Sequence, residues 1–431
     1  MIKKLSFVLV IIILFLLQLS CGRQTARNTN SLIYWSSNNT DEIAFAREVV
    51  SKWNKDHPGE PLRFQPVPEG QSSEEVILAA VVGGTTPDIY SNMWQGDVEL
   101  YARAGRLIAL DTLPGFTDFL YMRCDTMVVK EITSTDGHIY QIPWKINPIM
   151  MIYNEKMFEQ AGFGQPPKSY SEFYEAAKKI QRFDESGGYV NRWIGYSEVQ
   201  ALWWQRFFDF YPLYLAASGG AHLIEDNKVV FNNKYAIETF RFLKTLYDNQ
   251  YFARERLSAR QDPFLGGDIA TRFTGPWEIV HAEHFKPEGF RYNFAPLPVP
   301  DDFRGNAYTY GDTKNIVIFN TCKKPRQAWE FLKYVIDHEG DMMLLKITGQ
   351  IPRRKDLLSD SEFLEFFMQR PLMMQFAKQA KYVKGPDICP VLKEVFEVIS
   401  QQYEACVIYG KKTPEEAISD AADQAALLLL Q

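Results

Sequence analysis

The sequence predicts an α/β protein built from two lobes. Short β-forming runs alternate with amphipathic helices along most of the chain, a pattern typical of sheets flanked by helices. The chain has 431 residues, which is more than one hydrophobic core usually supports. Its content of 46% hydrophobic and 23% charged residues is that of an ordinary soluble protein.

The alternation begins at Ser31. Residues 31–37 (SLIYWSS) predict a strand, and 40–58 predict a helix whose inward face carries Ile43, Ala46, Val50 and Trp53. Thr40 or Asp41 is the expected N-cap of this helix. Because strand and helix keep alternating, a parallel sheet is expected. The further segments are a strand at 61–67, a helix at 72–84, a strand at 87–92 and a helix at 96–105.

A second lobe is predicted after Pro143. Residues 148–154 are strand-like, and 168–183 form an amphipathic helix that starts with a capping box at Ser169 and Glu172. Residues 149–295 therefore have the pattern of a separate lobe. Further predicted elements are helices at 234–250, 325–340 and 413–430 and a buried strand at 315–320.

The N-terminus has the pattern of an export signal. Two lysines precede an apolar run from Leu5 to Leu17, which is shorter than the roughly 20 residues of a spanning helix. Residues 1–21 resemble a bacterial lipoprotein signal with Cys21 as the lipidated residue, although Gln18 stands where such signals usually have leucine. Plain cleavage and an uncleaved anchor are the alternatives. Residues 22–30 are polar and predict a tether.

Charge and cysteines limit the function further. The formal charge is −6, and it becomes −8 when residues 1–20 take away Lys3 and Lys4. An acidic chain argues against nucleic acid as a partner. Four cysteines remain beside Cys21, which allows two disulfides or four buried thiols in a protein outside the cytoplasm: Cys124, Cys322, Cys389 and Cys406.

The order of several segments resembles the family 1 extracellular solute-binding proteins, the sugar-type receptors of bacterial ATP-driven importers. Each segment is loose alone, but six in the right order are specific, and they span nearly the whole mature chain. They are WSSNNTDEIAFAREVVSKWNKDHPG, AAVVGGTTPDIYS, GRLIALD, YQIPWKINPIMMIYNEKMFEQAGFGQPPKSYSEFYEAAKKI, TGPWEI, and KPRQAWEFLKYVID together with GQIPRRKDL.

This resemblance implies a periplasmic-binding-protein-like fold, in which two α/β lobes close on a ligand held in the cleft between them. The N-terminal lobe would comprise residues 31–143 and 305–347, and the C-terminal lobe residues 149–295 and 350–431. Hinge crossings are expected near residues 143–149, 295–308 and 345–352.

Tryptophans are the first candidates for ligand contact, because an indole can cover the flat C–H face of a sugar while amides and carboxylates bind its hydroxyls. The resemblance implies this role for Trp277, since the family commonly stacks sugar on a tryptophan in the matching G-x-W segment. Core packing is the alternative. Trp35 and Trp94 are expected at strand ends on the cleft side.

Trp144 at the first crossing and the pair Trp203 and Trp204 are further candidates. Consecutive helical residues point about 100° apart, so at most one of the pair can face the cleft squarely. Trp53 and Trp329 lie on apolar helical faces and are expected in the core.

Polar ligand contacts are expected from residues that follow the predicted strands, although such residues are often only solvated loop. Arg354 is a further candidate that could instead pair with acids at the hinge. The strand-end candidates are Glu69, Asn92, Asp97, Tyr310 and Asp312.

The sequence contains no constellation typical of an enzyme. The nucleophile-elbow, phosphate-loop, dinucleotide and H-E-x-x-H motifs are all absent. His281 and His284 lie one turn apart beside Glu283, but no third ligand follows at a telling spacing, so a surface helix is expected. We predict no catalytic residues, no metal site and no cofactor.

These observations favour a monomeric, extracytoplasmic lipoprotein that captures a mono- or oligosaccharide and delivers it unchanged to an inner-membrane ABC permease. Two alternatives remain at this point. One is a carbohydrate-active enzyme at the cell surface, and the other is the same receptor fold binding a non-sugar solute. Many aromatic and few basic candidates favour a neutral sugar over an anion.

Overall fold

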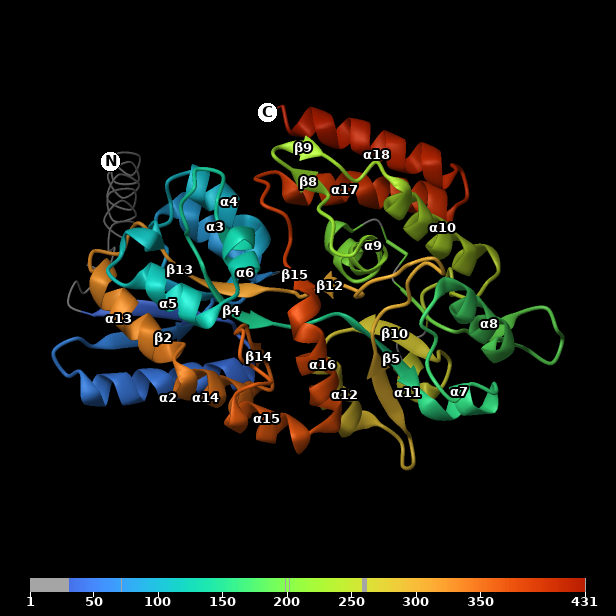
Figure 1. Cartoon of the computed structure of the whole chain (residues 1–431), viewed down its shortest axis with the longest axis horizontal. Helices are drawn as coiled ribbons and strands as arrows, with labels where there is room; N and C mark the ends of the chain where they lie inside the picture. Colours follow the sequence, from blue (N-terminus) through green and yellow to red (C-terminus); the bar gives the residue numbers. More distant parts are fainter. Residues whose placement is uncertain (1–30, 71, 198, 201, 258–261, 431) are drawn as a thin grey trace, which may run out of the picture.

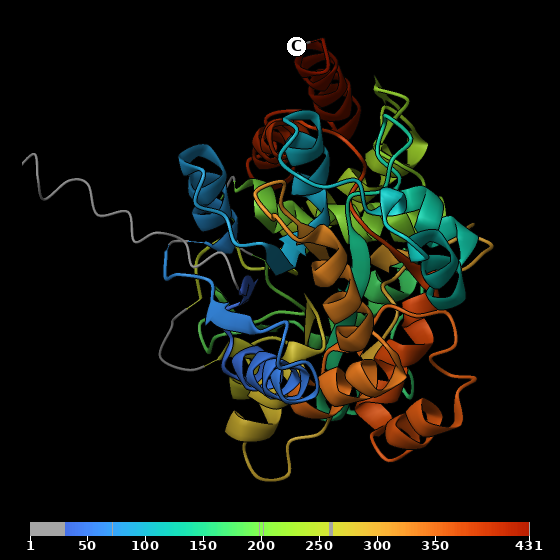
Figure 2. The same cartoon turned by 90° about the vertical axis from the view of Figure 1, so that its left-hand side faces the viewer.

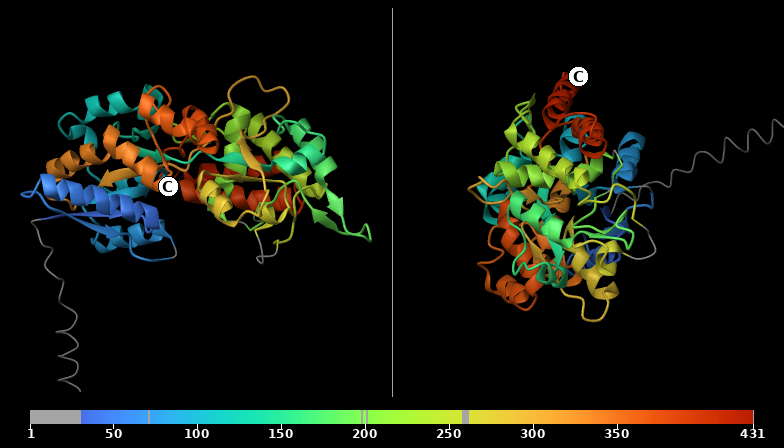
Figure 3. Two further views of the ribbon diagram at one scale, coloured as in Figure 1. Left: turned by 90° about the horizontal axis from the view of Figure 1, so that it is seen from below. Right: turned by 90° about the vertical axis from the view of Figure 1, so that its right-hand side faces the viewer.

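The computed structural model describes residues 31–430 apart from 71, 198, 201 and 258–261 (Figure 1). The predicted signal peptide at 1–21, the lipidation residue Cys21 and the tether at 22–30 lie outside the described residues. The described chain forms two α/β lobes that lie side by side along the long axis of the molecule (Figure 1; Figure 3, left). This arrangement confirms the predicted fold class.

A six-stranded sheet lies at the centre of the N-terminal lobe, in the order β14-β4-β13-β3-β1-β2. β1 pairs in parallel with β2 and β3, as predicted, but β13 runs antiparallel to β3 and β4, and β14 antiparallel to β4. The antiparallel direction of β13 is seen in its register, in which its first residue, Lys314, pairs with Trp94, the last residue of β3. The sheet is therefore mixed. Its strands are β1 (Leu32–Ser36), β2 (Leu62–Pro66), β3 (Ile89–Trp94), β4 (Ile142–Ile146), β13 (Lys314–Ile318) and β14 (Ile351–Pro352).

Helices cover both faces of this sheet (Figure 2). α2, α13 and α14 bury Phe45, Trp53 and Trp329 against one face, which confirms the core positions predicted for both tryptophans. α3 and α4 pack Ile77 and Tyr101 against the other face. The helices of this lobe are α2 (Thr40–Asp56), α3 (Ser73–Gly83), α4 (Gln95–Arg103), η1 (Leu110–Thr112), α5 (Phe116–Arg123), α6 (Thr126–Ile132), α13 (Pro325–Val335) and α14 (His338–Thr348).

Two helix boundaries differ from those predicted. Asn39, not Thr40 or Asp41, caps α2, since its side chain accepts hydrogen bonds from two backbone N–H groups of the first turn. The helix predicted at 325–340 is two helices, because Asp337 accepts a hydrogen bond from Gly340 N at 2.7 Å and begins α14.

The C-terminal lobe is built around a three-stranded antiparallel sheet, β10-β5-β11, rather than a parallel one. β10 and β11 flank β5 on opposite sides, and α12 connects them. The sheet strands are β5 (Met150–Asn154), β10 (Thr271–Thr274) and β11 (Tyr292–Ala295), and two small hairpins are β6 (Arg182–Phe183) with β7 (Val190–Arg192) and β8 (Ile224–Glu225) with β9 (Lys228–Val229).

The largest core of the molecule lies among the helices of this lobe, and the β6–β7 hairpin projects from its far end (Figure 3, left). The helices are α7 (Glu155–Gln160), α8 (Tyr170–Ile180), η2 (Trp203–Phe207), α9 (Phe210–Ser218), α10 (Lys234–Asp248), α11 (Pro263–Gly266), α12 (Trp277–Phe285), α15 (Ser361–Met368), α16 (Pro371–Gln379), η3 (Ala380–Tyr382), α17 (Leu392–Tyr403), η4 (Glu404–Ile408) and α18 (Pro414–Leu428). Cys124, Cys322, Cys389 and Cys406 are buried free thiols.

Three chain segments run together between the lobes. β12 (Thr309–Tyr310) pairs in parallel with β15 (Val383–Lys384). The link between β4 and β5 lies against β12, because Asn147 N donates to Gly311 O at 2.6 Å and Ile149 N donates to Tyr310 O at 2.9 Å. These backbone hydrogen bonds hold the three segments together where the chain passes between the lobes.

Candidate ligand cleft

A cavity of about 600 Å³ opens between the two lobes. The N-terminal lobe contributes the start of α2, Asn92 of β3 and the start of β13, and the C-terminal lobe contributes the first turns of α12 and parts of α15 and α16. The ends of sheet strands and the start of a helix therefore meet at this cavity, where ligand is expected in an open α/β sheet. The residues used below are Asn39, Asn92, Lys145, Trp277, Asp312 and Lys314.

Trp277 provides the aromatic surface of the cavity. β10 ends at Thr274, and the Gly275-Pro276 turn places Trp277 at the first position of α12. The indole lies over Gly275, where a Cβ atom would meet the ring at 2.1 Å. With 42% of its surface exposed, Trp277 keeps a large apolar area beside the cavity.

Two further aromatic rings continue from Trp277 along the C-terminal lobe. Phe208 lies edge-on to Trp277 at 6.1 Å between ring centroids, and Trp204 lies edge-on to Phe208 at 6.5 Å. Trp204 is 43% exposed, whereas its neighbour Trp203 packs inward. Only one of the two tryptophans is therefore exposed, and neither of them lines the cavity beside Trp277.

The polar groups opposite Trp277 come from the N-terminal lobe. Lys314 Nζ lies 3.1 Å from Glu74 Oε1 and 3.9 Å from Asp312 Oδ1. Against the effect of burial, these two carboxylates raise the pKa of Lys314, and Lys314 in turn holds the pKa of Glu74 below its usual value. Lys145 forms a second buried pair, with Nζ 2.6 Å from Glu42 Oε1. The two buried lysines of the cavity are thus each paired with a carboxylate.

A smaller chamber of about 330 Å³ adjoins the main cavity, and the two share Asn92 and Lys314. Asn38 and Glu74 line it. Glu69 is exposed next to Pro68 and Gly70, which also line this chamber. The polar surface available to a ligand therefore extends beyond the cavity beside Trp277.

Of the residues predicted from sequence, Asn92, Trp277 and Asp312 line the main cavity. Sequence reasoning missed Asn39, Lys145 and Lys314. Asn39 had a signal, because an N-cap that follows a strand lies at a sheet edge. Lys145 lies inside β4 and Lys314 begins β13, and only the tertiary pairing of β4, β13 and β3 brings both residues to the cleft.

Four other predicted residues lie in a cluster where the lobes touch each other. Trp94 belongs to the hydrophobic cluster of the C-terminal lobe, and its Nε1 donates to Tyr310 Oη at 3.0 Å. Trp203 packs on Trp94 with 5.4 Å between ring centroids. Asp97 Oδ1 lies 2.7 Å from Lys393 Nζ on α17. These side chains bind one another instead of lining the open cavity.

The prediction of ligand contact is wrong for two residues, and for a third the alternative role is observed. Trp35 lies within β1, not after it, and is buried among apolar side chains of α3 and β3. Trp144 is fully buried against Phe45, because inward positions of β4 face the core rather than the cleft. Arg354 pairs with Asp341 at 3.1 Å and with Asp356, which is the pairing with acids that the sequence left open as its alternative role.

The helix that carries His281 and His284 lies beside an ionic cluster. The structure brings Asp262, Glu278 and His281 within 4.8 Å of one another, a third partner that the sequence spacing did not indicate. Arg272 Nη2 lies 2.8 Å from Asp262 and 3.4 Å from Glu278. The guanidinium of Arg272 therefore already pairs with both carboxylates.

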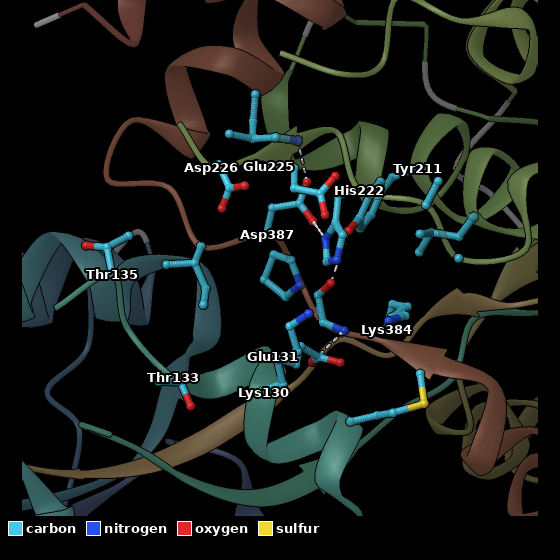
Figure 4. A pocket seen from close by; sticks show the side chains of 18 of the residues that line it. Lys130, Glu131, Thr133, Thr135, Tyr211, His222, Glu225, Asp226, Lys384 and Asp387 are labelled. Atoms are coloured by element: carbon cyan, nitrogen blue, oxygen red, sulfur yellow. Dashed lines mark hydrogen bonds and ion pairs between the residues drawn. The ribbon is translucent and has the colours of Figure 1, made fainter. Parts of the chain in front are cut away.

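A separate polar cavity of about 520 Å³ lies between α6 and the region of α9 and β8 (Figure 4). His222 Nδ1 lies 2.7 Å from Asp387 Oδ1, and the other oxygen of Asp387 accepts hydrogen bonds from the backbone of Leu223 and Ile224. Glu131 accepts a hydrogen bond from Gly385 N at 2.9 Å and pairs with Arg353. The segment after β15 is thus tied to both lobes.

The fold, with two lobes around a polar cleft that has one exposed indole, defines the class of two-lobed solute-binding proteins. The family model described as bacterial extracellular solute-binding protein matches residues 48–409, and the chain belongs to this family. Family members bind substrates rather than transform them. The protein is accordingly an extracytoplasmic solute-binding component of an ABC importer.

Relatives and solved structures support this assignment. The chain is similar to the maltotriose-binding protein of Pyrococcus abyssi, with 25% identity over 78% of this chain and 69% of the relative. It is also 20% identical to the sn-glycerol-3-phosphate-binding periplasmic protein of Pectobacterium atrosepticum, over 95% and 93% of the two chains. The cyclic α-maltosyl-1,6-maltose binding protein from Arthrobacter globiformis has the same fold, with a TM-score of 0.78, 21% identity and coverage of 93% and 98%.

Within residues 31–430, leaving aside the short gaps, none of the helices has both the length and the apolar character needed to span a bilayer.

Proposed function

We propose that this protein captures a neutral carbohydrate in the cleft beside Trp277 and delivers it unchanged to the permease of an ABC importer. The observation that carries the proposal is the position of Trp277, an indole that is 42% exposed on the wall of an interlobe cavity. Its apolar face can cover the C–H face of a sugar ring, while Asn92 and Asp312 across the cavity bind hydroxyl groups.

The ion pairs of two buried lysines favour a neutral ligand. Lys314 and Lys145 line the cavity, and each is paired with a carboxylate of its own lobe. Lys346 and Arg370 also line the cavity. An anion such as a sugar phosphate would have to compete with those carboxylates, whereas hydroxyl groups can bind without displacing them. This argument ranks a sugar above the sn-glycerol-3-phosphate that one relative binds.

Thermal unfolding of residues 22–431 tests the proposal. The protein is titrated with neutral mono- and oligosaccharides and, in parallel, with glycerol 3-phosphate. A ligand at 100 times its Kd stabilises the folded state by about 2.7 kcal/mol, which raises the unfolding temperature. We expect a shift with a neutral sugar that is recovered intact. A shift with glycerol 3-phosphate alone would show that the ligand is this anion and not a neutral sugar. Recovery of a cleaved sugar would indicate an enzyme.

We further propose that Cys21 carries a lipid that holds the monomeric protein at the outer surface of a membrane, close to its permease. The apolar run that precedes Cys21 is too short for a spanning helix, and the polar residues 22–30 can act as a tether. The tether would let the lobes reach the permease while the lipid keeps the protein from diffusing away.

A further inference from the structure

A further cavity between the lobes has an excess of cationic side chains. It has a volume of about 450 Å³ and lies between the start of α6 in the N-terminal lobe and the end of α16 with η3 in the C-terminal lobe. It shares no lining residue with the cavity beside Trp277. We call this space the basic cavity, and its cationic lining residues are Arg353, Arg354, Lys355, Lys381 and Lys384.

The basic cavity and the ligand cleft lie on opposite sides of the chain that links the lobes. Lys145 and Asn147 line the cleft, whereas Ile146, which stands between them, lines the basic cavity. Successive side chains of an extended chain point to opposite sides, so the link after β4 separates the two spaces. Lys384 of β15, a second linking segment, also lines the basic cavity. A molecule in this cavity would therefore lie against the linking segments, on the side away from the cleft.

Two of the five cations already form ion pairs. Arg353 Nη2 lies 2.9 Å from Glu131 Oε1, and Arg354 Nη1 lies 3.1 Å from Asp341 Oδ2. Burial alone would raise the pKa of Glu131, but Arg353 and other partners hold it below its usual value, so this carboxylate is charged. Since Arg353 matches that charge, Glu131 adds no excess negative charge to the basic cavity.

The other three cations form no ion pair of 4.0 Å or less within the described part of the chain. Lys355 Nζ donates a hydrogen bond to a backbone oxygen of α5 at 2.8 Å. Lys381 Nζ lies 4.8 Å from the ring centroid of Tyr382, and Lys384 Nζ lies 6.0 Å from that of Tyr308. These ring contacts are of cation–π type and leave the ammonium groups free to donate hydrogen bonds.

The charge of the basic cavity is opposite to that of the whole protein. Besides the paired Glu131, the described lining contains one carboxylate, that of Asp125. Three unpaired lysines against one aspartate leave an excess of two positive charges, in a chain whose formal charge is −6. Because the lysines surround a cavity and are not spread over the surface, they create a local positive potential that concentrates anions.

We propose that the basic cavity is a second binding site, which takes a small anion with more than one negative charge, such as a phosphate or a di- or tricarboxylate. Lys381 and Lys384 bind the charged oxygens, because an ammonium group is a point charge that accepts phosphate and carboxylate alike. Tyr308 and Leu357 line the same space and can contact an organic part of the ligand. This inference goes beyond the sugar proposal and does not depend on it.

Calorimetric titration of residues 22–431 with inorganic phosphate and, separately, with citrate tests the site at constant ionic strength and neutral pH. The wild type is compared with the double variant Lys381→Gln/Lys384→Gln. The matched control is Lys55→Gln/Lys378→Gln, which removes the same charge from exposed positions outside the cavity. We expect at least one of the two anions to bind, with an affinity that falls roughly tenfold or more in the cavity variant and stays unchanged in the control.

Trp277→Ala locates the anion, since the indole lines the cleft and not the basic cavity. Three results would each overturn the proposal. They are no binding of either anion to the wild type, equal weakening in both lysine double variants, and loss of anion binding in Trp277→Ala. Absence of sugar binding would leave the anion result intact, so the two proposals are judged separately. The same variants assign any shift seen with glycerol 3-phosphate to the cleft or to the basic cavity.

Discussion

Trp277 and Trp94 show how one local arrangement can serve two purposes. Each tryptophan stands at the junction of a strand and a helix, and each lies over a nearby glycine: a Cβ atom on Gly275 or Gly96 would meet the indole at 2.1 or 2.3 Å. Yet Trp277 is 42% exposed and Trp94 is 4% exposed. The difference comes from the opposite lobe, which covers Trp94 with Trp203 and leaves Trp277 at the cavity.

Replacing the exposed indole should therefore weaken sugar binding without unfolding the protein. For Trp277→Ala we expect a loss of roughly 10- to 100-fold in sugar affinity, which corresponds to about 1.4 to 2.7 kcal/mol. Isothermal calorimetry with the sugar identified by thermal unfolding measures this change. Unchanged affinity would show that the sugar binds elsewhere.

The glycine beneath the indole can be tested separately. In Gly275→Ala the new methyl group would displace the ring of Trp277, so we expect weaker binding with the indole still present. Gly59→Ala is the matched control, because a Cβ atom there meets nothing within 4 Å. Equal affinity in both glycine variants would show that the position of the ring over Gly275 does not matter.

At the scale of elements, helix ends are held by short polar side chains. Thr413 and Glu416 form a complete capping box at the start of α18, as the residue order T-P-E-E indicates. By contrast, the break between α13 and α14 depends on Asp337, which looks like an ordinary helical residue within a long apolar-periodic run. Periodicity alone cannot locate such a break, because the apolar face continues across it.

Removing the cap of α18 should cost about 1 kcal/mol of folding free energy in Thr413→Ala. The helix packs on α10 and α17 through Ala417, Ile418 and Ala421, so loosening its first turn weakens the C-terminal lobe. Urea unfolding followed by circular dichroism measures the loss. Thr413→Ser keeps the hydroxyl group and should retain most of the stability.

The hydrogen bond between His222, which precedes β8, and Asp387, which follows β15, should make the folding stability depend on pH. The hydrogen bond to Asp387 raises the pKa of His222 above its ordinary value near 6.5. A raised pKa in the folded state means that the stabilisation is complete below about pH 6.5 and is lost as pH rises through the folded-state pKa. Between about pH 6 and 8, the unfolding temperature should therefore fall more in the wild type than in His222→Gln.

His284→Gln serves as the control for this experiment, since His284 is exposed on α12. Its pH profile should follow that of the wild type. If His222→Gln keeps the full decrease across the same range, the pair with Asp387 does not contribute to the pH dependence of folding.

At the scale of the whole molecule, the two lobes are linked by chain segments and by side chains that contact each other. The linking segments are β12, β15 and the residues between β4 and β5. Side chains of the two lobes also contact each other directly, with Trp94 packed on Trp203 and Asp97 2.7 Å from Lys393. The cavity beside Trp277 has lining residues from both lobes, so it follows from the relative position of the lobes rather than from either lobe alone.

The anchoring of the whole protein is open to a direct test. In a bacterial host, the wild-type chain should partition into the membrane or detergent phase, whereas Cys21→Ser should be recovered in the aqueous fraction outside the cytoplasm. The prediction rests on the cysteine after the short apolar run. Membrane recovery of both forms, with the signal still attached, would favour an uncleaved anchor instead.

The sequence by itself determined the α/β class, the two lobes and the order of the main elements, because these depend on local periodicity, caps and turns. The cleft position of Trp277 was predicted from the resemblance of its segment to a known family. Only the tertiary structure decided which candidates reach the cavity. Trp35 and Trp144 are core residues, Arg354 pairs with Asp341, and Lys145 and Lys314 line the cleft. The physical reason is that a side chain's exposure depends on the elements packed against it from distant parts of the chain, and a strand sequence does not specify those partners.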